Sequence, residues 1–94
     1  MKYYVDWDGS NIWVREEDGF RQQLKGWALR DLIEVLVPDD TIYIEDSFES
    51  YSPKHRNDAV HLARDRKIML LGMSTRATFQ ILKEMEAPLA QENG

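Results

Sequence analysis

Residues 41–71 read TIYIEDSFESYSPKHRNDAVHLARDRKIMLL, and this stretch decides the fold class. Its first five residues place Ile42 and Ile44 on one face and Tyr43 on the other, which predicts a strand over 41–45. A helix is predicted from about His55 or Arg56 to Arg66, because apolar side chains recur there at helical spacing. Residues 68–71 are continuously apolar, as in a strand buried on both faces. Strand, helix and strand in succession indicate an α/β domain.

The residues before this stretch predict three more strands. Residues 2–7 alternate in polarity, a turn follows at Asp8-Gly9-Ser10, and Ile12 and Val14 continue as a second strand. Residues 16–19, Glu-Glu-Asp-Gly, predict a hairpin turn, because an Asp-Gly pair readily takes the positive φ that such a turn requires. Residues 20–24 are the third strand. The three strands together predict an antiparallel meander.

Two further helices complete the predicted order. One covers residues 27–37 and stops at Pro38, and the other runs from Thr75 to about Glu86 after Ser74 as N-cap. The predicted order is therefore β-β-β-α-β-α-β-α, a mixed sheet with helices on both faces. We expect one domain over residues 1–86 and a flexible C-terminal tail over residues 87–94.

Composition narrows the class of protein. The 94 residues include no cysteine, which excludes disulfide scaffolds and thiolate metal sites and fits a reducing compartment. No apolar run approaches the roughly 18–20 residues of a membrane helix. An acid at Asp6 comes too early for a signal peptide. A cytoplasmic location and no membrane partner are expected.

The charge of the chain bears on nucleic-acid binding. Its net charge is −5, whereas nucleic-acid-binding proteins are usually basic. Seven of the 12 lysines and arginines nevertheless lie in residues 51–94. Five of them are candidate nucleic-acid contacts: Lys54, Arg56, Arg64, Lys67 and Arg76. The alternative is a solvated helix face with no ligand.

Asp6 and Glu45 are the candidate catalytic residues. Asp6 lies near the end of the first predicted strand, and Glu45 ends the fourth. If these strands are parallel neighbours, both carboxylates emerge at one sheet edge, where ligands of open α/β sheets bind. Carboxylate oxygens suit Mg²⁺ or Mn²⁺, and Asp8 is close enough to serve as a further metal ligand. The alternative for Asp8 is a turn residue, and 17 acidic residues also place some carboxylates at strand ends by chance.

These residues form a pattern known from one family. The run Val5-Asp6-Trp7, the Asp-Gly turn, the helix and the strand from Ile42 to Glu45 resemble the N-terminal RuvC-like, RNase H-like domain of DEDD-type insertion-sequence transposases. The resemblance implies that Asp6 and Glu45 are the first two catalytic acids. It also implies Mg²⁺- or Mn²⁺-dependent phosphodiester chemistry on DNA or branched nucleic acid. The other two acids of the family have no counterpart after Thr75, so the set is incomplete.

Two alternatives stay open. Residues 8–11, Asp-Gly-Ser-Asn, resemble the opening motif of NYN/PIN-type ribonucleases, although a helix follows that motif and a hairpin is predicted here. The other alternative is a non-catalytic binding or regulatory α/β protein, alone, as a homodimer or with a protein partner. The missing acids and the negative charge favour this second alternative.

Overall fold

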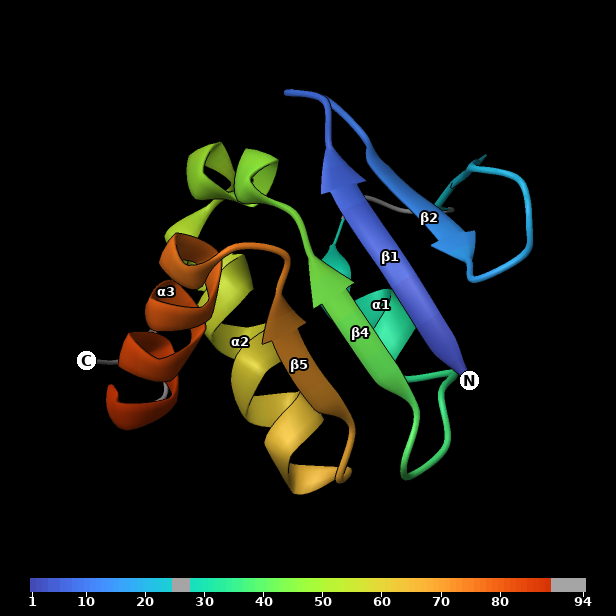
Figure 1. The fold of residues 1–94 in the computed structure, drawn as a ribbon. Coiled ribbons are helices and arrows are strands. Elements are labelled where there is room, and N and C mark those ends of the chain that lie inside the picture. Colours follow the sequence, from blue (N-terminus) through green and yellow to red (C-terminus); the bar gives the residue numbers. More distant parts are fainter. Residues whose placement is uncertain (25–27, 89–94) are drawn as a thin grey trace.

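A five-stranded mixed sheet organises the chain in the computed structural model, which describes residues 1–24 and 28–88 (Figure 1). The strand order across the sheet is β3-β2-β1-β4-β5. β2 is antiparallel to both β1 and β3, whereas β4 is parallel to β1 and to β5. The strands are β1 (Lys2–Trp7), β2 (Ile12–Glu16), β3 (Gln22–Gln23), β4 (Thr41–Ile44) and β5 (Met69–Gly72).

The helices occupy the predicted places along the chain. They are α1 (Leu29–Ile33), α2 (Pro53–Asp65) and α3 (Thr75–Glu86), and a 3₁₀ turn, η1 (Asp46–Ser50), is added after β4. Serine caps begin the two longer helices: the hydroxyl of Ser52 accepts from the amide of His55 at 3.4 Å, and that of Ser74 accepts from Ala77 at 3.1 Å. The small α/β domain with a mixed sheet and three helices agrees with the sequence prediction.

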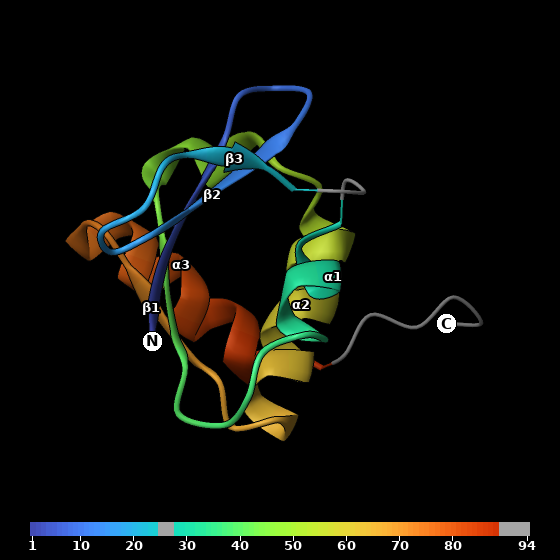
Figure 2. The same ribbon diagram turned by 90° about the vertical axis from the view of Figure 1, so that its right-hand side faces the viewer.

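We expected helices on both faces of the sheet, and the structure differs: its helices do not cover both faces. α1 and α2 lie on one face, and α3 stands beside β5 at the edge and packs against α2 (Figure 2). The reason lies in the strand order. The connections β3–α1–β4 and β4–α2–β5 both join parallel strands and move in the same direction across the sheet, so right-handed crossovers place both helices on the same side. Within the described residues, no helix covers the other face.

The core lies between the sheet and this helical layer. Val5 and Ile44 are paired residues of β1 and β4, and both point into the layer, as Phe48 of η1 does. The neighbouring residues Tyr4 and Tyr43 therefore point to the uncovered face, because side chains alternate along a strand. The buried apolar set also includes Ile12, Leu29, Ile33, Ile42, Ala59, Val60, Leu70 and Ile81.

Several boundaries differ from the sequence prediction. Met69 is 56% exposed, so β5 is not buried on both faces: it is an edge strand and one face of the sheet is open. Phe20 is 91% exposed and the third strand is only two residues long. α1 ends at Ile33, and Trp27, which was expected to begin it, lies outside the described residues. The expected tail also lies largely outside them, from residue 89 on.

Candidate active-site edge

Asp6 and Glu45 come from neighbouring parallel strands. Val5 is paired with Ile44, and the amide of Glu45 donates to the carbonyl of Val5 at 3.1 Å. The condition set by the sequence, that the first and fourth strands are parallel neighbours, is therefore met. Asp6 shares the uncovered face with Tyr4, and Glu45 is exposed directly after the last residue of β4. Both residues lie at the carboxyl ends of their strands.

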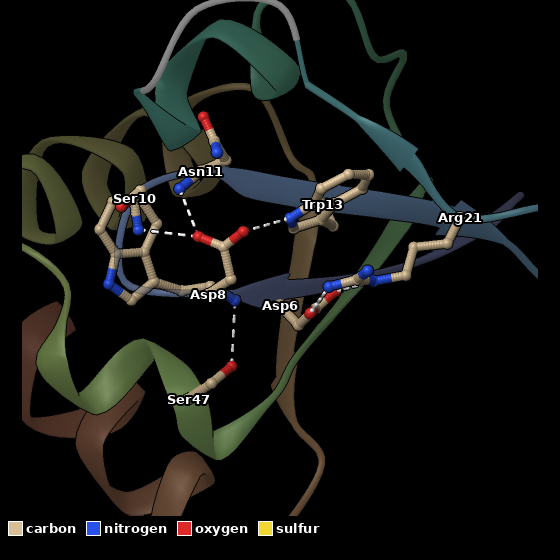
Figure 3. A network of polar contacts seen from close by, with 8 residues as sticks. Asp6, Asp8, Ser10, Asn11, Trp13, Arg21 and Ser47 are labelled. Carbon is tan, nitrogen blue, oxygen red and sulfur yellow. Dashed lines mark hydrogen bonds and ion pairs between the residues drawn. The ribbon is translucent and has the colours of Figure 1, made fainter.

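Arg21 neutralises Asp6. Its Nη2 lies 2.7 Å from Oδ2 of Asp6, and its Nε donates to Oδ1 at 3.3 Å (Figure 3). The guanidinium carbon also lies 4.2 Å from the centroid of the Trp13 ring, in a cation–π contact. The hydrogen bond to Asp6 raises the pKa of Arg21, and the charges of Asp6, Asp8 and Glu45 act in the same direction. The negative charges of these three carboxylates therefore favour the charged form of Arg21, and Asp6 is the one in direct contact with it.

Asp8 organises the loop between β1 and β2. Its Oδ1 accepts from the amides of Ser10 at 2.8 Å and Asn11 at 2.6 Å, and its Oδ2 accepts from the indole Nε1 of Trp13 at 2.7 Å (Figure 3). The bond from Trp13, followed by those from the two amides, lowers the pKa of Asp8 to about 2. Both carboxylate oxygens are thus occupied within the loop. This is the turn role that the sequence left open, and it leaves Asp8 poorly placed as a metal ligand.

Asp6 and Glu45 provide two carboxylates as possible metal ligands at this edge. Within residues 1–24 and 28–88, no three acidic or histidine side chains gather into a group able to hold a metal ion. Mg²⁺, however, is commonly bound by one or two carboxylates together with substrate phosphates and water. Asp6 and Glu45 fit that donor set once Arg21 releases Asp6.

The candidate nucleic-acid contacts do not form one surface. Lys54 and Arg64 are exposed near opposite ends of α2, about 15 Å apart at 1.5 Å per residue. Lys67 is exposed beyond the end of α2, and Arg76 pairs with Glu49.

Arg56 points into the domain instead of toward a ligand. Its Nε lies 2.6 Å from Glu84, and its Nη1 donates to the buried carbonyl of Phe48 at 2.9 Å. The sequence pattern predicted Arg56 as a nucleic-acid contact like the other basic residues, because spacing along one helix does not reveal a partner on another helix.

A cluster of two tyrosines and an arginine on the uncovered face was not predicted from the sequence. The rings of Tyr4 and Tyr43 stack with centroids 5.0 Å apart, and the guanidinium of Arg15 lies 4.5 Å from the Tyr4 centroid. Alternation in the first and fourth strands was a signal for Tyr4 and Tyr43. Arg21 gave no such signal, because its position depends on the register between the second and third strands.

Comparisons of the chain with protein-family models, with curated proteins and with solved structures find no match. The geometry of the edge therefore carries the functional argument. No helix among the described residues has the length and apolar character needed to cross a membrane.

Proposed function

We propose that the chain is a RuvC-like, RNase H-like domain that acts on nucleic acid, with Asp6 and Glu45 as its metal-binding carboxylates. The observation that carries the proposal is the side-by-side position of these two residues at the carboxyl ends of β1 and β4. The element order β-β-β-α-β-α-β-α supports it, since this is the order expected of that fold.

The Asp6–Arg21 pair is compatible with metal binding. Both side chains reach solvent, with exposed fractions of 24% and 49%, and exposed ion pairs contribute little to stability. A divalent cation bound with a phosphate would polarise the phosphodiester and activate water. Asp6 and Glu45 would orient that cation. Once released, the guanidinium of Arg21 would be free to bind a phosphate oxygen of the substrate through paired N–H donors.

The uncovered face supports nucleic acid as the substrate class. Tyr4 and Tyr43 present stacked rings on this face, and Arg15 lies against Tyr4. Aromatic rings and arginine planes are the groups on which unpaired bases stack. Tyr4 shares this face with Asp6, two residues further along β1, so a strand stacked on the tyrosines would pass the carboxylate edge.

A second candidate function is non-catalytic binding. The observation that favours it is the Asp6–Arg21 pair itself, because a guanidinium that stays in place supplies the charge that a cation would supply. In that case the face binds a ligand without cleaving it.

Calorimetric titration with Mn²⁺, with and without a short single-stranded DNA, separates these functions. For the first function, we expect Mn²⁺ binding that the DNA strengthens and that Asp6→Asn and Glu45→Gln abolish. Arg21→Ala should bind Mn²⁺ several-fold more tightly, because Asp6 is no longer paired. Asp65→Asn, an exposed acid on α2, is the matched control and should bind as the wild type does. Equal Mn²⁺ affinity in all five proteins would refute the metal site. Cleavage assays on single-stranded and branched DNA are informative about Asp6 only if the variants do differ in Mn²⁺ binding.

A further inference from the structure

Exposed apolar side chains gather at one edge of the domain. Of the eight large apolar side chains exposed among the described residues, four lie on β5, on α3 or between them: Met69, Met73, Phe79 and Leu82. Phe79, Leu82 and Met73 also line an open groove together with Gly72 and Thr78. This is the edge at which the sheet ends, beside α3 (Figure 1). An apolar surface of this kind at a sheet edge marks an interaction site.

α3 carries apolar side chains on two opposite faces. Ala77 and Ile81 are buried against the domain. Phe79 is 64% exposed and Leu82 is 50% exposed, and the intervals from Thr75 to Phe79, Leu82 and Glu86 are four, three and four residues. That spacing places the four residues in one stripe along the helix, facing away from the core.

The stripe is complementary to itself. If two α3 helices pack antiparallel with a two-fold axis between Gln80 and Ile81, Phe79 lies opposite Leu82 of the partner subunit, and Leu82 opposite the partner's Phe79. The same axis places Glu86 opposite the partner's Thr75. Each carboxylate of Glu86 then lies at the amino end of the other helix, where a negative charge is favourable. An unrelated partner would not require this symmetry of the sequence.

We propose that two copies of this chain form a two-fold dimer through antiparallel α3 helices. The open groove between β5 and α3 adds to the same contact surface, because Phe79 and Leu82 belong to both. A two-fold interface uses the same patch on both subunits, as this stripe allows.

The described C-terminal residues leave this surface free. The ring Nε2 of His61 lies 2.9 Å from the carbonyl of Ala87, and Asn57 donates to the carbonyl of Pro88 at 3.4 Å. The chain therefore passes from α3 onto α2, not onto the stripe. Glu45 also lines a small pocket with Ala77 and Gln80 of α3, but Phe79 and Leu82 are not among the residues of that pocket. The variants that test the dimer therefore change neither Asp6 nor Glu45 nor a residue of this pocket, and the dimer and the metal site can be tested separately.

Sedimentation equilibrium of the full chain, from about 1 µM to about 1 mM, tests the dimer. We expect the wild type to approach twice the monomer mass. Phe79→Glu and Leu82→Lys should each remain monomeric, because a charge then faces an apolar side chain of the partner. The double variant Phe79→Glu, Leu82→Lys should dimerise again, because each new carboxylate faces a new ammonium across the axis. Val35→Glu, at an apolar position 75% exposed after α1, is the control and should dimerise as the wild type does.

Several results would overturn the proposal, provided that circular dichroism shows each variant to be folded. They are a wild type that stays monomeric at the highest concentration, a Phe79→Glu variant that dimerises normally, and a double variant that stays monomeric. The last result would refute the antiparallel register specifically. If Val35→Glu weakens the dimer as much as Phe79→Glu, the effect of an added charge is not specific to this stripe and the proposal also fails.

Discussion

The ion pair between Arg56 and Glu84 links α2 to α3 inside the domain. The two atoms of the pair lie 2.6 Å apart, and the side chains are only 7% and 12% exposed. Burial lowers the pKa of Arg56, and the charge of Glu84 opposes that effect. Removing one partner therefore leaves the other charge buried and uncompensated, which costs more than the pair itself contributes.

The change Glu84→Gln removes the charge and preserves the shape of the side chain. Loss of one member of a buried ion pair costs about 3–5 kcal/mol. We expect about 3 kcal/mol, because the amide oxygen of the variant can still accept the hydrogen bond that Gln80 donates to Glu84. A small domain has a total stability of about 5–15 kcal/mol, so this is a large share. Replacing both residues, as Arg56→Met with Glu84→Met, should cost much less than the sum of the single changes, because no charge is left unpaired.

Urea unfolding followed by tryptophan fluorescence measures these free energies of unfolding. The control is Arg64→Met, whose side chain is 55% exposed on the same helix, and its effect should stay within about 0.5 kcal/mol. If Glu84→Gln unfolds at the wild-type urea concentration, and Arg56→Met weakens DNA binding without loss of stability, the structural role assigned to Arg56 is refuted. That outcome would restore its role as a nucleic-acid contact.

Two further predictions concern Asp8, in the loop between β1 and β2, and the contact between β5 and α3. Because the folded pKa of Asp8 is about 2, below its ordinary value of 3.8, its hydrogen bonds stabilise the fold above that ordinary value and are lost as the pH falls through about 2. NMR titration should therefore give a midpoint near 2, and Trp13→Phe should raise it; an unchanged midpoint in the variant would contradict the assigned cause. At Gly72, an added Cβ would collide with the backbone nitrogen of Thr78, so α3 must shift. We expect Gly72→Ala to lower the free energy of unfolding by about 1–3 kcal/mol, and thermal unfolding that matches the wild type would contradict this contact.

Local patterns in the sequence predicted much of the fold. β1 has the predicted bounds, and α3 begins after the predicted cap, Ser74. The junction before α2 was placed too late, since the helix begins at Pro53, with Ser52 as its cap. A proline is well suited to the first helical turn, so the sequence contained this signal.

The side-chain partners could not be predicted in the same way. Glu84 meets Arg56 because α2 and α3 pack against each other, and they are 28 residues apart in the chain. Arg21 meets Asp6 because β2 pairs with both β1 and β3. These contacts depend on the packing of helices and the register of strands, and neither is encoded by a spacing within one element.

The direction of the crossovers accounts for the exposure of the candidate site. Because both helical connections cross the sheet in the same direction, α1 and α2 protect only the face that carries Val5 and Ile44. Asp6, one residue along from Val5, is left on the open face, where a solvated carboxylate can pair with Arg21 and can also exchange that partner for a ligand. A helix over this face would have required Asp6 to be buried with a permanent partner, as Arg56 is with Glu84. The difference between these two ion pairs, one exposed and one enclosed, is therefore a consequence of the strand order, and it is why we assign binding to the first and stability to the second.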